Sequence, residues 1–154
     1  GAEAWASGGD ARARRSARLS SLSLKALPYP GFPTDLQPQM MAVLALADGT
    51  SIVQDGVFES RFLHVNELQK MGARIDVQGG TAVITGVPHL RGADVRATDL
   101  RAGAALILAG LAASEETAVF QIQHINRGYE NIVTKLRSLG AAINLDSSEE
   151  EDLA

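Results

Sequence analysis

One carboxylate and three arginines in this 154-residue chain are of the types, and stand at the positions, from which a site for an anionic ligand could be built. Asp35 follows the stiff segment PYPGFPT at the start of an apolar, helix-like stretch, so its carboxylate could accept a hydrogen bond or a proton from a substrate hydroxyl. A carboxylate at a helix N-terminus is a weak base, because the helix dipole and free amides favour its charged form. Positioning a hydroxyl is therefore the more modest role that the sequence predicts for Asp35.

A structural interpretation of Asp35 stays open beside this one. Thr34 can cap the expected helix, and Gln37, three residues later, completes a capping-box pattern. Asp35 would then be a favourable charge worth about 0.3–1 kcal/mol at the helix start. On spacing alone, this interpretation is the more common one.

The arginines stand near expected helix starts. Arg101 follows Asp99 by two residues in the first turn of a second expected helix, where the dipole disfavours a cation. It either pairs with Asp99 or Asp94 at the surface, or binds an anion together with the helix amides. Arg127 again stands at an expected helix start, and Arg61 occupies the comparable region of the first half. Three such arginines favour a polyanionic ligand.

Composition limits the class of protein. The chain is 45% hydrophobic with a formal net charge of -4, which fits a soluble globular protein and disfavours a general binder of nucleic acid or of membranes. Arginines cluster between residues 12 and 18, and the acidic segment 146–154 is expected to be a disordered tail. The longest apolar run, 102–113, is shorter than the roughly 20 residues that cross a bilayer.

Neither a metal nor another cofactor is expected. The chain has no cysteine, which excludes disulfides and thiolate metal sites within it, and its three histidines lack metal-ligand spacing. No phosphate-binding, nucleophile-elbow or dinucleotide-binding glycine motif occurs. The first residue is glycine rather than methionine, which suggests a trimmed product or the later part of a longer protein.

An internal repeat organises the elements that would position these residues. Two segments, about 1–71 and 72–141, each begin with Gly-Ala and continue into a hairpin with a Gly-Gly turn, at 8–9 and 79–80. Each then has a helix opened by Thr-Asp-Leu, a short strand (50–54 or 117–123) and a second helix. A last strand at 141–145 would begin a third copy.

The apolar positions predict one buried stripe on each helix. The first helices of the two segments share one spacing, and their expected stripes are Leu36, Met40, Val43, Leu44 and Ala47 in the first segment and Leu100, Ala104, Ile107, Leu108 and Leu111 in the second. The second helices are expected to bury Val65, Leu68 and Met71 in the first segment and Tyr129, Ile132, Val133, Leu136 and Leu139 in the second. The fold class is therefore α/β (α+β), with repeated β-β-α-β-α units in one domain over residues 1–145 and helices packed against one face of the sheets.

Four segments in order, PYPGFPTDLQPQ, VFESRFLHVNELQKMGA, ATDLRAGAALILAGLAA and HINRGYENI, carry a resemblance. Together they resemble the C-terminal part of the UDP-N-acetylglucosamine 1-carboxyvinyltransferases, a family of enolpyruvyl transferases, from about residue 25 to 141. The resemblance implies an inside-out α/β barrel of two three-repeat domains with substrates in the cleft between them. It also implies a cytoplasmic enzyme that transfers the enolpyruvyl group of phosphoenolpyruvate to the 3′-hydroxyl of UDP-N-acetylglucosamine, for peptidoglycan synthesis.

Roles follow from the resemblance by position. Asp35 matches the aspartate that contacts the sugar hydroxyl and is proposed to take its proton, and Val57 matches a residue whose backbone holds the UDP-sugar. Arg101 and Arg127 match arginines that bind the phosphate and carboxylate of phosphoenolpyruvate. Arg61 matches a further arginine of the cleft.

Three departures qualify these roles. Ser60 and Asn126 replace the family's usual asparagine and aspartate, and the arginine cluster replaces an ordinary strand pattern. The family's mobile-loop cysteine and essential lysine belong to an N-terminal part that this chain lacks, so the chain is expected to be inactive alone and to need that part as its partner. Two other classes stay open: a non-catalytic module that binds anions or a partner, and, more weakly, an RNA-binding protein.

Overall fold

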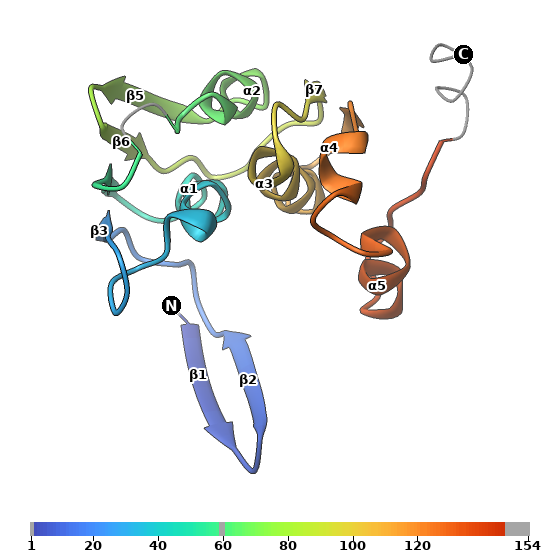
Figure 1. The fold of residues 1–154 in the computed structure, drawn as a ribbon, viewed down its shortest axis with the longest axis horizontal. Helices are drawn as coiled ribbons and strands as arrows, with labels where there is room; N and C mark the ends of the chain where they lie inside the picture. Colours follow the sequence, from blue (N-terminus) through green and yellow to red (C-terminus); the bar gives the residue numbers. More distant parts are fainter. Residues whose placement is uncertain (1, 59–60, 147–154) are drawn as a thin grey trace.

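The computed structural model describes residues 2–58 and 61–146, and in them two β-α-β units place their helices side by side (Figure 1). The first unit consists of β3 (Ser23–Ala26), the 3-10 helix η1 (Thr34–Leu36), α1 (Gln37–Leu44) and β4 (Thr50–Asp55). The second consists of β7 (Asp94–Arg96), α3 (Leu100–Leu111) and β8 (Ala118–Phe120). In each unit the two strands are parallel, as a helical crossover connection requires.

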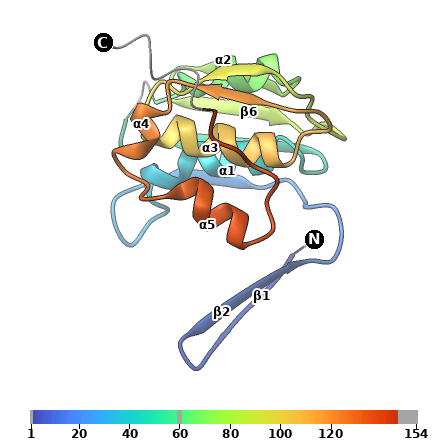
Figure 2. The same cartoon turned by 90° about the vertical axis from the view of Figure 1, so that its right-hand side faces the viewer.

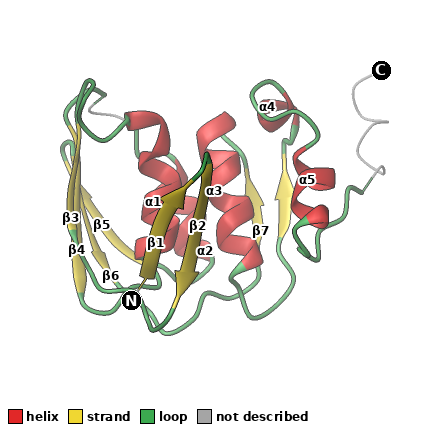
Figure 3. Cartoon of the chain, turned by 90° about the horizontal axis from the view of Figure 1, so that it is seen from below, coloured by secondary structure: helices red, strands yellow, loops and turns green. Residues whose placement is uncertain are grey.

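A four-stranded sheet forms around the first unit. After β4 come α2 (His64–Lys70) and the hairpin of β5 (Arg74–Gln78) and β6 (Thr81–Thr85), and the sheet order is β3-β4-β6-β5. β6 is antiparallel to both neighbours, with Ile75 opposite Ile84 on the buried face. The sheet therefore joins strands from both expected segments. Seen from below, α1 and α3 lie between this sheet and β7 (Figure 3).

The C-terminal region departs from the sequence prediction. The strand expected at 117–123 ends at Phe120, because Gln121 has a positive φ of 61° and the chain then turns into α4 (Gln123–Asn126). α5 (Ile132–Ser138) follows. The strand expected at 141–145 is absent: those residues are in neither helix nor strand, since no neighbouring strand of the described chain pairs with them.

The predicted N-terminal hairpin is present but stands apart. β1 (Ala2–Ser7) and β2 (Asp10–Arg15) are antiparallel, and Gly8 and Gly9 make the turn with φ values of 61° and 90°. Every residue of both strands is exposed. The hairpin projects away from the other elements, which is plain when the molecule is turned by 90° (Figure 2). It pairs with no other strand that the structure describes.

The main core lies between the four-stranded sheet and the three helices α1, α2 and α3. Its fully buried side chains include Met41, Leu68, Met71, Ile84 and Leu106. The stripe predicted for residues 65, 68 and 71 of the second helix is confirmed, since all three side chains are buried. The hairpin pair Ala82 and Ile84 is buried as well.

The stripes predicted for α1 and α3 are wrong in part. Leu36, Val43, Leu108 and Leu111 are between 38 and 50% exposed, whereas the neighbouring Met41, Leu106 and Ala105 are fully buried. The physical reason is that α1 and α3 pack against each other as well as against a sheet, so burial is wide on each helix. It includes Leu44, Ala104 and Ile107 of the predicted stripes and extends to residues outside them. The stripe predicted for 129–139 is only half-buried, and Leu139 is 84% exposed.

Candidate functional site

Asp35 lies at the centre of the candidate site. It is the middle residue of η1, just before α1, and its side chain is 65% exposed. Its Oδ1 accepts a hydrogen bond from Arg101 Nε at 2.6 Å and another from Arg61 Nη1 at 3.2 Å. These three residues come from η1, from the loop before α2 and from the first turn of α3. The structure therefore brings together three of the five residues that the sequence predicts, and we call them the Asp35 cluster.

The loop that carries Asp35 is anchored by a residue that the sequence analysis missed. Asp55, the last residue of β4, is 4% exposed, and its Oδ2 accepts a hydrogen bond from Thr34 Oγ1 at 2.6 Å. Its Oδ1 accepts from the backbone N–H groups of Val57 (2.9 Å) and Phe58 (2.8 Å). This buried carboxylate thus ties η1 to the loop after β4. The signal was available: an aspartate before glycine at a strand end is typical of a side-chain-stabilised turn.

The capping box predicted for Thr34 and Gln37 is wrong. Neither η1 nor α1 has a side-chain cap, because the Thr34 hydroxyl is directed to Asp55 and also accepts from Arg61 Nη1 at 2.9 Å. The Gln37 side chain is fully buried and donates to Met41 Sδ at 3.2 Å. The helix start is therefore arranged around tertiary contacts rather than around a local cap.

Arg61 is held from three sides. It donates to Thr34 and Asp35, and its guanidinium carbon lies 3.9 Å from the centre of the Phe58 ring. Its side chain is 18% exposed. Stacking on an aromatic ring together with two hydrogen bonds fixes the guanidinium plane, so Arg61 offers a cation of defined orientation at the edge of the cluster.

Of the two aspartates in the Thr-Asp-Leu segments, Asp35 and Asp99, only Asp99 caps its helix. Its Oδ1 accepts from the backbone N–H groups of Arg101 (2.8 Å) and Ala102 (3.1 Å) at the start of α3. The side chain of Arg101, 25% exposed, is directed away to Asp35 instead. Neither pairing expected for Arg101, with Asp99 or with Asp94, is among the ion pairs of the described residues. The cation at the start of α3 is thus balanced by a carboxylate of the other unit.

Arg127 does not join the Asp35 cluster. It follows the last residue of α4 rather than beginning a helix, so that part of the prediction is wrong. Its side chain is exposed and makes no hydrogen bond or ion pair within the described part of the chain. Two residues later, Tyr129 Oη accepts from Gln39 Nε2 of α1 at 3.1 Å, which holds this segment near the helices. Arg127 is therefore a cation without a hydrogen-bond or ion-pair partner among the described residues.

Val57 offers a ligand less than the sequence predicts. The Val57 side chain is 37% exposed, and its backbone N–H is already used by Asp55. A ligand that contacts the Val57 backbone would therefore meet its carbonyl oxygen. Ser60 and the acidic segment 147–154 lie outside the described residues.

One of the three histidines for which the sequence predicts no metal-binding role lies beside the cluster. His64, the first residue of α2, is 2% exposed, and burial lowers its pKa to about 4, with the nearby Asp99 carboxylate opposing that shift. A cavity of about 180 Å³ is lined by Phe58, Arg61, Leu63, His64 and Asp99. His64 is therefore neutral at physiological pH.

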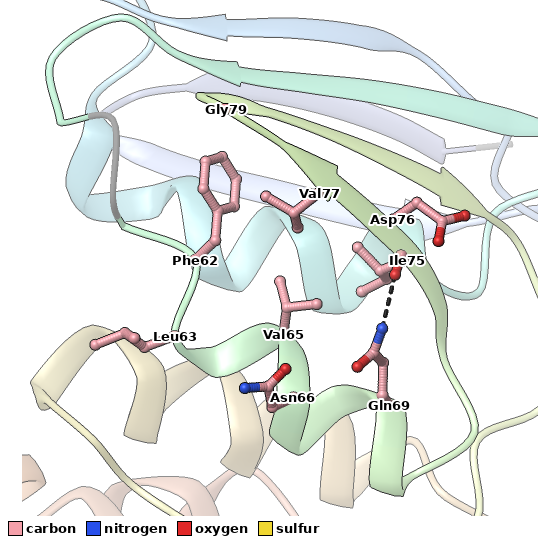
Figure 4. A pocket seen from close by; sticks show the side chains of 9 residues that line it. All are labelled: Phe62, Leu63, Val65, Asn66, Gln69, Ile75, Asp76, Val77 and Gly79. Atoms are coloured by element: carbon pink, nitrogen blue, oxygen red, sulfur yellow. Dashed lines mark hydrogen bonds between the residues drawn. The ribbon is translucent and has the colours of Figure 1, made fainter.

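A larger hollow, of about 440 Å³, lies between α2 and the β5–β6 hairpin (Figure 4). Phe62, Val65 and Val77 point into it, and Gln69 Nε2 closes one side by donating to the Ile75 carbonyl at 2.8 Å. The lining includes no arginine or lysine, and Asp76 is its one charged residue. An anionic ligand does not fit this lining.

The described residues offer neither a metal site nor a membrane-spanning helix. No group of three or more histidines, aspartates or glutamates there is arranged to hold a metal ion. No helix in the same ranges is long and apolar enough to cross a membrane.

Comparison with known proteins gives one consistent result. The sequence model of the EPSP synthase (3-phosphoshikimate 1-carboxyvinyltransferase) family matches residues 4–136. UDP-N-acetylglucosamine 1-carboxyvinyltransferase of Ruegeria pomeroyi is 56% identical over 130 residues, which are 84% of this chain and 31% of that protein. The protein named UDP-N-acetylglucosamine 1-carboxyvinyltransferase 1 in Caldanaerobacter subterraneus is 54% identical over 135 residues, 88% of this chain and 32% of its own.

Solved structures agree. The enolpyruvyl transferase NikO from Streptomyces tendae superposes with a TM-score of 0.83 at 34% identity, over 94% of this chain and 34% of that one. EPSP synthase from Acinetobacter baumannii superposes with a TM-score of 0.66 at 20% identity, over 96% and 35%, which is a likeness of fold alone. The chain spans about a third of the length of the relatives it matches.

Proposed function

The chain belongs to the EPSP synthase family of enolpyruvyl transferases, and from that premise we propose that it is the C-terminal part of a UDP-N-acetylglucosamine 1-carboxyvinyltransferase. The complete enzyme would transfer the enolpyruvyl group of phosphoenolpyruvate to the 3′-hydroxyl of UDP-N-acetylglucosamine and release phosphate. Relatives with that name are 54–57% identical over more than four-fifths of the chain, which favours this acceptor over a shikimate derivative. Synthesis of peptidoglycan precursors in the cytoplasm is the setting that goes with this reaction.

The observation that carries the proposal is the Asp35 cluster. A carboxylate from one β-α-β unit is hydrogen-bonded by arginines of two other segments, with both bonds on the same oxygen. An exposed ion pair contributes little stability, so this arrangement is better explained by a ligand than by folding. An anion that recruits the guanidinium groups would free Oδ1 of Asp35 for the sugar hydroxyl.

Each residue then has a role. Asp35 accepts the hydrogen bond, and later the proton, of the hydroxyl, while Arg101 and Arg127 bind the phosphate and carboxylate of phosphoenolpyruvate. Arg61, stacked on Phe58, is the fixed cation between the two ligands. Val57 contributes its backbone carbonyl to the UDP-sugar. Arg127 would approach the others when the cleft closes.

The remaining wall of the cleft would come from an N-terminal part outside this chain. The chain accounts for about a third of its relatives' length, and apolar side chains of α1 and α3 are exposed in it. We assign the chain two repeats, about 1–71 and 72–141, of one three-repeat domain, and we expect it to be inactive alone. Neither a metal nor another cofactor takes part in the proposed reaction.

Complementation tests the proposal. The chain is mixed with the N-terminal part of a relative, and phosphate release from phosphoenolpyruvate is followed with and without UDP-N-acetylglucosamine. We expect release that needs both parts and both substrates and that falls in Asp35→Ala and Arg127→Ala. Asp76→Asn, an exposed carboxylate away from the cluster, is the control. Release that is absent, or unchanged in the two variants, contradicts the proposal.

A non-catalytic module that binds anions is the second candidate, favoured by the free cation at Arg127 and the paired Arg61 and Arg101. Calorimetry separates it from the first. Micromolar binding of phosphoenolpyruvate to the chain alone, without turnover after complementation, supports this module.

A further inference from the structure

We propose that the cavity beside the Asp35 cluster is a site for a hydroxyl group, held between the His64 imidazole, the Asp99 carboxylate and the Arg61 guanidinium, and that His64 is a positioning residue for the start of α3. The group is an ordered water or a hydroxyl of a bound ligand; both have the same hydrogen-bonding chemistry. The site itself does not depend on the proposed reaction, but its effect on catalysis rests on that proposed function.

The His64 imidazole has a buried nitrogen without a partner. His64 is 2% exposed, and its Nε2 is buried without a hydrogen-bond partner among the described residues. A buried polar atom in that state is costly, so native proteins nearly always supply a partner from the chain, a ligand or an ordered water. An apolar side chain would avoid the cost at this position. The presence of an imidazole there therefore indicates a partner outside the described residues, and an ordered water or a ligand hydroxyl is the chemistry that fits.

The cavity provides room and complementary groups for that partner. It measures about 180 Å³ and is lined by His64, Asp99 and Arg61 together with the apolar Phe58 and Leu63. Its polar lining thus combines an acceptor, a donor and a neutral imidazole that can be either. A hydroxyl or water both donates and accepts, and a buried water typically makes about three hydrogen bonds. A bare cation or anion would meet a charge of its own sign on one wall.

Asp99 connects this site to the Asp35 cluster. Its Oδ1 caps α3 by accepting from the backbone N–H of Arg101, whose side chain reaches Asp35 Oδ1 at 2.6 Å. A hydroxyl fixed between His64 and Asp99 would hold the carboxylate in the capping orientation. Burial keeps the imidazole neutral, so it can hydrogen-bond without adding a second positive charge beside Arg61.

Nuclear magnetic resonance on the chain itself tests the site. Long-range proton–nitrogen correlations report the tautomer of His64, and cross-relaxation between its ring protons and water reports a bound water, with the exposed His89 as the control. A water contact in the free chain supports the water form of the site. A contact that appears only with UDP-N-acetylglucosamine supports the ligand form. A His64 ring that contacts neither overturns the site, whether or not the complemented enzyme turns over.

Two substitutions test the positioning role. His64→Gln keeps a polar end in the cavity, whereas His64→Phe fills it with an apolar ring. We expect His64→Phe to shift the amide resonances of Arg101 and Ala102 and to weaken binding of phosphoenolpyruvate by about tenfold, with His64→Gln within about threefold of the parent. If both variants keep these resonances and the affinity, the role is overturned. If His64→Phe does not fold, the amide shifts of His64→Gln and the water contact of the parent chain decide.

Discussion

The helix starts at Asp35 and Asp99 have the same three residues, Thr-Asp-Leu, and use them in opposite ways. The Asp99 carboxylate turns onto its own helix and accepts two backbone N–H groups of α3. The Asp35 carboxylate turns away from α1 and accepts from two arginine side chains. Identical local sequence therefore does not decide what a carboxylate at a helix start does.

Tertiary neighbours account for the difference. At the first start, the buried Asp55 carboxylate accepts a hydrogen bond from the Thr34 hydroxyl. Residues 34–36 form a 3-10 helix, and the α-helix begins only at Gln37. At the second start, α3 begins directly after Asp99. The first start thus has no side-chain cap, and its carboxylate is directed to arginines of other segments, which is the arrangement that we propose as a site. The second is an ordinary capped helix that supports the site through the Arg101 backbone.

The largest effect that we expect from this comparison is on enzymatic activity. In the complemented enzyme, Asp35→Ala is expected to lower phosphate release by about 100-fold or more, because it removes the group that we propose as acceptor of the hydroxyl proton. Asp99→Asn, which keeps an oxygen for the cap, is the matched variant and should lose far less. Equal losses in the two variants would remove the functional distinction between the two starts.

The next largest expected effect is a loss of stability at acidic pH. It comes from His64, which lies near Asp99 at the second helix start. The unfolded His64 binds a proton near its usual pKa of 6.5, while the buried one does so only near 4, so the unfolded state takes up more protons between these values. Stability should therefore fall as the pH drops from 6.5 to 4, by up to about 3 kcal/mol. Urea unfolding of the parent and of His64→Gln, compared at pH 7 and pH 4.5, isolates this contribution. An equal loss in both chains would contradict it.

Removing the anchor of the first start should be nearly as costly. Asp55→Ala leaves the Thr34 hydroxyl and two backbone N–H groups without their acceptor, so we expect a loss of about 2–3 kcal/mol in the free energy of unfolding. Asp55→Asn retains an acceptor oxygen and should lose less. Urea denaturation measures both. A negligible loss in Asp55→Ala would mean that Thr34 does not depend on Asp55.

The smallest expected effect is a difference in the free energy of unfolding between variants of the two aspartates. Asp99→Ala should cost about 1 kcal/mol, the usual value of an N-cap, whereas Asp35→Ala should change the free energy of unfolding by under about 0.5 kcal/mol, since exposed ion pairs contribute little. Asp99→Ser, which can cap in the same place, should recover most of the loss. If Asp35→Ala were the more destabilising of the two, Asp35 would be a structural residue.

Much of this arrangement was predictable from the sequence, because it depends on periodic or local signals. The two glycine-turn hairpins, the helices that follow each Thr-Asp-Leu and the buried face of α2 appear as expected. Arg61 and Arg101 were singled out with Asp35, and they do meet it. Their meeting was expected only as convergence on a ligand, since no local pattern tells which carboxylate a distant arginine will bond.

The parts that could not be predicted depend on contacts across the fold. The local sequence predicts Thr34 as a helix cap, but its hydroxyl donates to Asp55, twenty-one residues later in the chain. His64 has no spacing that marks it, and its importance comes from burial and the nearby Asp99. The stripes of α1 and α3 assumed one buried face per helix, and they miss the burial that comes from helix packing on helix.

The N-terminal hairpin has a consequence for the time scale on which parts of the chain open. Two strands with no other strand beside them are marginally stable in water, and every residue of β1 and β2 is exposed. Their amide protons should exchange with deuterium almost as fast as those of an unstructured peptide, while those of α3 wait for the whole fold to open. If an added N-terminal part packs against this hairpin, the Trp5 amide should exchange more slowly, so its protection would report the association of the two parts.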